Sequence, residues 1–185
     1  MTPREGWIEW GGHRTWFRVV GELDSGFDPL LCLHGGPGST HHYFAPLERL
    51  AKDGRAVVLY DQLGCGRSDR PPGIEWRFQV FLDELAALRA QLGLERVHLL
   101  GTSWGGMLAL EHALRQAGSL ASLILSSTLA YAGDWEVEAR RLRDESIYKG
   151  ARHAGMMSTP SPRQRSSQCS LCPRSTSTKT AVESR

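Results

Sequence analysis

The 185-residue sequence predicts an α/β fold in which helices cover both faces of a mostly parallel sheet. Two features lead to this prediction. Short continuous apolar runs, which are typical of strands buried on both faces, alternate with longer amphipathic segments of helical periodicity. Glycine-rich loops follow these runs, and in open α/β sheets ligands bind beyond the carboxyl ends of the strands. We therefore expect the glycine-rich loops to converge on one crevice.

The expected elements alternate along the chain after an N-terminal hairpin. Two runs rich in Trp, Thr, Phe and Val, separated by two glycines, indicate hairpin strands at residues 7–10 and 13–20. The later strands are expected at residues 30–33, 56–60, 97–100 and 120–126. The helices are expected at residues 41–52, 76–92, from 103 onward and at 135–147.

Residues 101–105, Gly-Thr-Ser-Trp-Gly, have the sequence of a nucleophile elbow. They lie between an apolar strand and a helix, which is the context that this motif requires. The turn should hold Ser103 in a strained conformation above the sheet, and Gly101 and Gly105 should prevent a collision of side chains across it. The N–H of Trp104, at the start of the helix, is then placed to stabilise an oxyanion.

Composition indicates an ordinary cytoplasmic protein with one core. The formal net charge is +2, which gives no sign of a nucleic-acid partner. The N-terminus lacks the apolar run of a secretory signal, and no stretch of about 18 apolar residues is present. We expect cytoplasmic localisation and no membrane partner; the sequence leaves the oligomeric state open.

The four cysteines do not suggest a metal site. Cys32 lies in an apolar strand and Cys65 in a glycine-rich turn, which fits two free thiols in a reducing compartment. Cys169 and Cys172 form a lone C-x-x-C pair without further ligands at a suitable spacing. We expect no metal and no cofactor.

Three motifs carry a resemblance to a known family: HGGPG at 34–38, DQLGCGRSD at 61–69 and GTSWGG at 101–106. In this order and spacing, over roughly residues 7–145, the sequence resembles the proline iminopeptidases of the α/β-hydrolase fold. The resemblance implies a serine aminopeptidase that releases N-terminal proline, or another N-terminal residue, from short peptides or aminoacyl amides through an acyl-enzyme. It implies no metal or cofactor.

By this resemblance Ser103 is the nucleophile, and the backbone N–H groups of Gly36 and Trp104 form the oxyanion hole. A glycine run lets the backbone approach a developing anion closely, and a proline within it fixes the turn and removes a competing donor. The other residues of this oxyanion loop are His34, Gly35, Pro37 and Gly38.

The other polar residues near the motifs are expected to be structural. The fold supplies its triad in the order Ser, Asp, His, so an upstream histidine such as His34 is expected to make a structural contact. Asp61 is expected to brace its loop. His112 lies nine residues along the helix from the nucleophile, too far to reach the hydroxyl, and is expected on the helix surface. His41 and His42 either line the pocket or take no part in it.

The sequence departs from the family after about residue 145. We expect residues 1–130 to form the N-terminal part of the core, 131–148 the start of a helical cap, and 149–185 a disordered Ser/Arg-rich tail. Residues 1–150 hold 16 basic and 19 acidic residues, whereas residues 151–185 hold 6 and 1. This switch favours a reading-frame error, which replaced the C-terminal strands and most of the cap, over a natural tail.

No triad acid or histidine can be identified, so we expect the chain as given to be nearly inactive and poorly stable. Two alternatives to the peptidase hypothesis stay open. One is an amino-acid amide hydrolase or esterase of the same fold, because the acids that would bind a free amino terminus belong to the missing cap. The other is a non-catalytic binding module, which the absent triad partners favour and the complete elbow disfavours.

Overall fold

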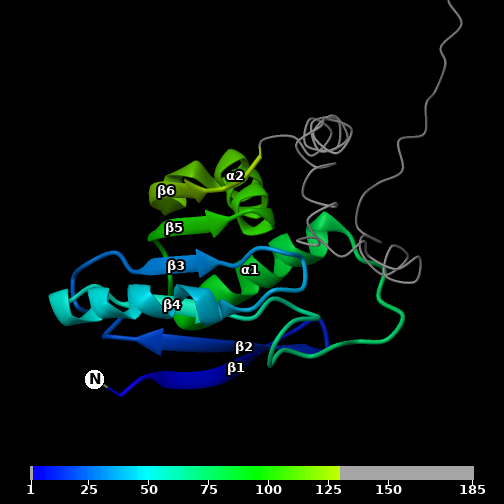
Figure 1. Ribbon diagram of the computed structural model, residues 1–185, viewed down its shortest axis with the longest axis horizontal. Helices are drawn as coiled ribbons and strands as arrows, with labels where there is room; N and C mark the ends of the chain where they lie inside the picture. Colours follow the sequence, from blue (N-terminus) through cyan, green and yellow to red (C-terminus); the bar gives the residue numbers. More distant parts are fainter. Residues whose placement is uncertain (1, 130–185) are drawn as a thin grey trace, which may run out of the picture. The chain divides into compact units, whose positions relative to one another are not determined.

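The computed structural model describes residues 2–129, which form one six-stranded sheet in the order β1-β2-β4-β3-β5-β6 (Figure 1). The expected cap helix at 135–147 and the tail lie outside the described residues. The strands are β1 (Arg4–Trp10), β2 (His13–Val20), β3 (Leu30–Leu33), β4 (Val57–Tyr60), β5 (Val97–Thr102) and β6 (Leu120–Ser126).

Pairing in this sheet is antiparallel at the N-terminal hairpin and parallel through the rest. β1 pairs with β2 and β2 with β4 in antiparallel fashion, whereas β4, β3, β5 and β6 run parallel. The predicted hairpin and mostly parallel sheet are therefore confirmed. The helical segments are η1 (His41–Asp53), α1 (Phe78–Leu92), α2 (Trp104–Gln116) and the short η2 (Ala117–Ser119).

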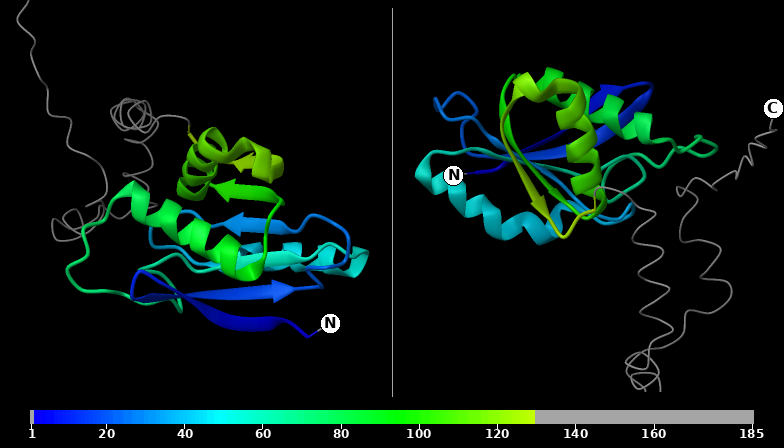
Figure 2. Two further views of the ribbon diagram at one scale, coloured as in Figure 1. Left: turned by 180° about the vertical axis from the view of Figure 1, so that it is seen from behind. Right: turned by 90° about the horizontal axis from the view of Figure 1, so that it is seen from above.

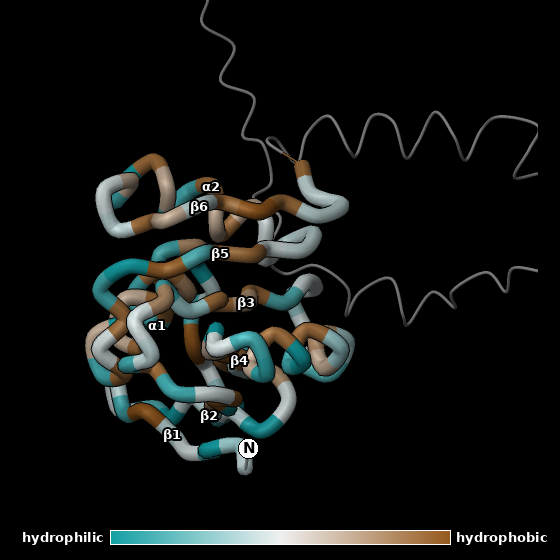
Figure 3. The backbone as a smooth tube through the Cα atoms, turned by 90° about the vertical axis from the view of Figure 1, so that its left-hand side faces the viewer, coloured by the Kyte–Doolittle hydropathy of each residue, from teal (hydrophilic) through white to brown (hydrophobic). Residues whose placement is uncertain are grey.

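Helices cover both faces of the sheet, as the sequence predicted. Figures 1 and 2 show η1 on one face and α1 and α2 on the other. The chain moves one way along the sheet from β3 to β4 and the opposite way from β4 past β3 to β5. Because both crossovers are right-handed, their helical segments lie on opposite faces of the sheet. The hydropathy colouring of Figure 3 shows apolar residues along the central strands. On the η1 face the buried cluster consists of Leu30, Cys32, Phe44, Val57, Leu59 and Leu100.

Several predicted boundaries or windings need correction. β1 begins at Arg4, three residues earlier than expected, because its pairing with β2 extends to Val19. The segment 41–52 is helical, but it is wound as a 3-10 helix around Pro46, a residue that has no N–H to donate to an α-helical ladder. α1 begins at Phe78, two residues later than expected. β5 continues through Gly101 to Thr102, because its parallel pairing with β6 extends to Ser126.

His112 lies inside the protein, and the prediction that it lies on the helix surface is wrong. Its side chain is buried against α1, where Nη1 of Arg89 approaches its Nε2 at 2.7 Å. The same guanidinium donates to the carbonyl oxygens of Leu94, Glu95 and Ser119. Burial, with the adjacent positive charge, lowers the pKa of His112 to about 4. The ring is therefore neutral and accepts a hydrogen bond from Arg89.

The two described cysteines are free and buried, as predicted. Burial raises the pKa of Cys65 to about 11 and that of Cys32 further, so both remain thiols at neutral pH. No helix within residues 2–129 is both long enough and apolar enough to cross a bilayer.

Candidate active site

Ser103 lies at a sharp turn between β5 and α2, with φ 53° and ψ −119°. This is a conformation that non-glycine residues rarely adopt, and the backbone strain expected for the elbow is present. Neighbouring groups hold the turn: the Ser103 N–H donates to the Ser126 carbonyl (3.0 Å), and its carbonyl accepts from Gly106 N–H and the Thr128 hydroxyl. The residue is exposed to solvent. A nucleophile at this position would be accessible to a substrate.

The two elbow glycines are required for different reasons. A Cβ at Gly101 would collide across the turn, 2.6 Å from the Cα of Gly106, as the sequence predicted. A Cβ at Gly105 would instead strike the end of β3, at the Leu33 carbonyl and 2.6 Å from the His34 oxygen. Gly105 therefore allows α2 to approach β3 closely, and this contact could not be foreseen from the motif alone.

The oxyanion loop passes directly beside Ser103. The Cβ position of Gly35 is 3.2 Å from the Cβ of Ser103, and the Gly35 N–H donates to the Tyr43 hydroxyl. Gly36 has φ 126°, a conformation available to glycine and strained for other residues. Trp104 begins α2, so its N–H has no partner within the helix. The roles of Gly36 and Trp104 as oxyanion donors remain predictions.

His34 has the structural position expected of it. It is fully buried, and its Nε2 accepts a hydrogen bond from the Gln62 N–H at 2.9 Å. Its Nδ1 must then carry the proton and donates to the Gly35 carbonyl at 2.9 Å. Burial lowers the pKa of His34, which favours this neutral form. Both ring nitrogens are therefore occupied, and neither is available to Ser103.

Asp61 braces the loop that follows β4. Its Oδ1 accepts from the backbone N–H of His41 (2.9 Å) and lies 2.8 Å from the His41 Nδ1, while Oδ2 accepts from the Arg67 N–H (2.9 Å). Burial alone would raise the pKa of Asp61, but these hydrogen bonds outweigh it and lower the pKa. Asp61 is thus an ionised, fully buried anchor between η1 and the 61–69 loop.

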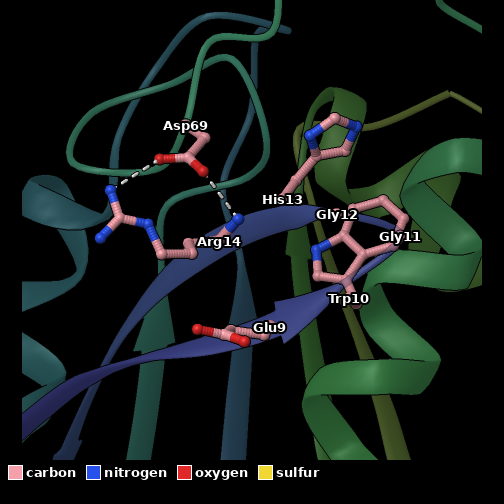
Figure 4. A pocket seen from close by; sticks show the side chains of 7 residues that line it. All are labelled: Glu9, Trp10, Gly11, Gly12, His13, Arg14 and Asp69. Carbon is pink, nitrogen blue, oxygen red and sulfur yellow. Dashed lines mark hydrogen bonds and ion pairs between the residues drawn. The ribbon is translucent and has the colours of Figure 1, made fainter.

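The other end of that loop is tied to β2. Asp69 accepts hydrogen bonds from the backbone N–H of Arg14 (2.9 Å) and from its guanidinium (3.2 Å), as Figure 4 shows. Ser68 accepts from the Trp16 N–H (2.8 Å) and donates to the Asp61 carbonyl. These bonds hold the loop beside an open surface hollow of about 440 Å³ at the hairpin turn, which the Arg14–Asp69 pair borders.

The histidines within residues 2–129 all have partners other than Ser103. His41 lies against Asp61 and stacks on exposed His42 at 4.2 Å. The remaining pairs are His34 with Gly35 and Gln62, His42 with Thr40, His98 with Ser122, His112 with Arg89, and His13 packed edge-on against Trp10. Within the same residues, no group of three or more His, Cys, Asp or Glu side chains is placed to hold a metal ion.

Sequence reasoning did not identify Gln62 as part of the site. The residue is fully buried, and its side-chain amide joins the His34 carbonyl to the Trp104 indole. Its presence inside the DQLGCGRSD motif was the available signal, but the motif does not reveal which neighbours a glutamine contacts.

The strained elbow, the adjacent glycine loop and the sheet order define a protein of the α/β hydrolase type. The chain belongs to the alpha/beta hydrolase fold family, which its residues 28–145 match. The expected fold class is confirmed.

The resemblance to proline iminopeptidases is also confirmed. The chain is 49% identical over 143 residues to a proline iminopeptidase of Clostridium botulinum, covering 76% of this chain and 49% of the relative. It is 46% identical over 144 residues to one from Clostridioides difficile, with the same coverage. The chain therefore spans about half the length of the curated relatives it matches.

Two solved structures resemble the fold closely. A proline iminopeptidase from Mycobacterium smegmatis superposes with a TM-score of 0.71 at 37% identity, covering 85% of this chain and 56% of that one. The crystal structure of VinJ gives a TM-score of 0.73 at 39% identity, covering 84% and 56%.

Proposed function

We propose that Ser103 is the nucleophile of a serine aminopeptidase that releases N-terminal proline, or another N-terminal residue, from short peptides. One observation carries this proposal: a strained, exposed serine lies beside the oxyanion loop, in a chain that is 46–49% identical to proteins named proline iminopeptidase. The names of these relatives support a peptide as the partner. A cytoplasmic location is part of the proposal.

The proposed reaction follows from the groups around the turn. The Ser103 oxygen attacks the carbonyl carbon of the N-terminal residue, and the oxyanion that forms is stabilised by the N–H groups of Gly36 and Trp104. A general base takes the hydroxyl proton and delivers it to the leaving nitrogen as the C–N bond breaks. Water then hydrolyses the acyl-enzyme by the same steps.

Residues 2–129 supply the nucleophile and the oxyanion donors, but no base. Their histidines have partners other than Ser103, so the base must come from outside this range. There the sequence offers only His153, in a Ser/Arg-rich stretch unlike the strand context from which the fold supplies its histidine. We therefore propose that the 185-residue chain is nearly inactive. Loss of one triad member leaves only the acceleration due to binding and the oxyanion hole, roughly 10³ to 10⁴ over water.

Added imidazole gives a direct test, because it can serve as an external general base. The chain is assayed with and without imidazole on prolyl and alanyl 4-nitroanilides and on a 4-nitrophenyl ester, with Ser103→Ala as the background. We expect imidazole to raise a Ser103-dependent rate on the prolyl anilide. Cleavage of the ester with none of either anilide would reject the peptidase and favour an esterase; saturable binding without any turnover would favour a binding module.

A further inference from the structure

The side chain of Gln62 connects the two sides of the proposed oxyanion hole. Its Nε2 donates to the carbonyl oxygen of His34 at 2.8 Å, and its Oε1 accepts from the indole N–H of Trp104 at 3.0 Å. His34 begins the oxyanion loop, and Trp104 directly follows Ser103. One amide group thus contacts both segments that carry the proposed donors.

The position of Gln62 in the sheet explains how it reaches both segments. Gln62 follows β4, whereas the oxyanion loop follows β3 and Trp104 follows β5. Since the sheet order is β4-β3-β5, the Gln62 side chain crosses above the end of β3. The last paired residues of β3 and β5 are Leu33 and Gly101, so the ladder between these strands ends before the oxyanion loop and before Ser103.

The chemistry of the contact calls for an amide. A single group must donate to a carbonyl and accept from an indole, and glutamine offers both atoms in one plane without depending on protonation. The Trp104 ring is held in turn by edge-on packing against Phe78 (5.0 Å) and Phe81 (5.4 Å). Gln62 has no freedom to adopt other contacts, because it is fully buried and its own N–H is bound to His34.

We infer that Gln62 is a positioning residue whose side-chain amide fixes the separation of the Gly36 and Trp104 N–H groups. The inference rests on the proposed function, which assigns these two N–H groups to the oxyanion hole. Donors that stabilise an oxyanion must be held in place before the charge develops, so the catalytic benefit depends on the groups that hold them.

The first test measures position and needs no activity. Gln62→Met removes both side-chain hydrogen bonds at similar length. The matched control is Gln91→Met, because Gln91 also bridges two backbone groups, the carbonyl and N–H of Glu9. We expect the backbone amide signals of Gly36 and Trp104 and the indole signal of Trp104, assigned with Trp104→Phe, to shift and exchange faster in Gln62→Met alone. Unchanged signals would overturn the inference.

A second variant covers the case in which Gln62→Met does not fold. The protonated carboxyl group of Gln62→Glu can make both hydrogen bonds, whereas at a pH that ionises it the acceptor for the Trp104 indole is kept and the donor to the His34 carbonyl is replaced by an acceptor. The Gly36 signal should then move more than the Trp104 indole signal. Equal or absent changes would contradict the two-sided contact.

The second test measures the effect on the oxyanion hole with phenylboronic acid, added together with imidazole as the external base. Phenylboronic acid forms a tetrahedral adduct with an active serine and carries no prolyl group. We expect about tenfold weaker binding of phenylboronic acid for Gln62→Met and for Trp104→Phe. The double variant should lose no more, because each substitution removes the same hydrogen bond between the two side chains. Gln91→Met should bind as the unaltered chain does. Full affinity in Gln62→Met would overturn the inference.

The two tests separate the inference from the function on which it rests. If the unaltered chain does not bind phenylboronic acid even with imidazole present, Ser103 as nucleophile is contradicted, while the amide signals still decide whether Gln62 positions the loop. If it binds phenylboronic acid but not the boronic acid analogue of proline, only the prolyl substrate is rejected.

Discussion

Two buried polar clusters contain residues at the carboxyl end of β4 or just beyond it, and they differ in how completely their polar atoms are hydrogen-bonded. The strand-end cluster consists of His34, His41, Asp61 and Gln62, and the helix-face cluster of Thr15, Tyr60 and Glu84. Within residues 2–129, three buried side-chain atoms have no hydrogen-bond partner. Two of them, the Tyr60 hydroxyl and Glu84 Oε2, belong to the helix-face cluster; the third, Nε1 of Trp16, belongs to neither.

The comparison indicates that hydrogen-bond donors and the depth of burial together set the pKa of a buried carboxyl group. Neither the Asp61 nor the Glu84 side chain is exposed to solvent. Both oxygens of Asp61 receive N–H donors, and its pKa is lowered. Glu84 receives the Thr15 hydroxyl and the Leu63 N–H on Oε1 alone. Burial therefore prevails and raises its pKa to about 8. With this pKa, Glu84 is mainly a neutral acid at pH 7.

The largest effect should be the dependence of stability on pH. Because the pKa of Glu84 is higher in the folded state than in the unfolded chain, its contribution is fully present below about pH 4.5 and is lost as pH rises through about 8. Denaturant unfolding should show a loss on the order of 4 kcal/mol between pH 5 and pH 9. Glu84→Gln, which mimics the protonated acid, should remove this loss.

The exposed neighbour on the same helix provides the control for that profile. Asp83 hydrogen-bonds to Gln79 at the surface, so Asp83→Asn should keep the pH dependence of the unaltered chain. A profile that is the same for Glu84→Gln and the unaltered chain would show that Glu84 is ionised in the folded state.

The matched substitution in the strand-end cluster should be more damaging at pH 5 than Glu84→Gln. In Asp61→Asn an amide N–H₂ must face a backbone N–H, of either His41 or Arg67, so at least one buried donor loses its partner. We expect a loss of about 3 kcal/mol in the free energy of unfolding, against about 1 kcal/mol or less for Glu84→Gln. Similar losses for the two would remove the contrast between the clusters.

Arg89 extends the comparison to a buried cation. Its guanidinium binds His112 and the carbonyl oxygens of Leu94, Glu95 and Ser119, more acceptors than three ammonium hydrogens can serve. Arg89→Lys should therefore cost about 2 kcal/mol in thermal or denaturant unfolding.

The control is Arg115→Lys, because Arg115 forms an exposed pair with Glu111 on α2. Such pairs contribute about 0.5 kcal/mol or less. If the two arginine substitutions cost the same, the many carbonyl contacts of Arg89 add nothing to stability.

The smallest effect concerns the strain at Ser103. Ser103→Gly should stabilise the chain by about 1 kcal/mol, because glycine adopts positive φ without a steric penalty. Ser103→Ala removes the same hydroxyl and keeps the Cβ, so it should give no comparable gain. Equal stabilities of the two variants in denaturant unfolding would show that the turn stores no strain.

The sequence predicted the sheet, the helices and the elbow because each depends on a local pattern. Apolar runs without charge marked the central strands, and the glycines marked positions where a Cβ cannot fit, such as Gly101. No local pattern could predict why Gly105 is needed, because a Cβ there would collide with the end of β3, some seventy residues earlier in the chain.

The two buried ionisable residues of α1 could have been noticed from the helical spacing of its apolar residues. Phe81, Leu85 and Leu88 form the apolar face of α1, and Glu84 and Arg89 fall within the same stripe at helical spacing. A charged residue on such a face must find partners, and Arg89 finds one in His112. The pairing itself joins residues on two helices, so no local pattern could place His112 inside.

The account's central claim is that Ser103 is the nucleophile and that residues 2–129 do not supply its base. Mass spectrometry of the chain treated with a fluorophosphonate tests it most directly. We expect no adduct without imidazole, and with imidazole a single adduct on the peptide that contains Ser103, absent in Ser103→Ala. An adduct on another residue would contradict the assignment of the nucleophile. Rapid labelling of Ser103 without imidazole, if it persists in His153→Ala, would show that residues 2–129 supply the base.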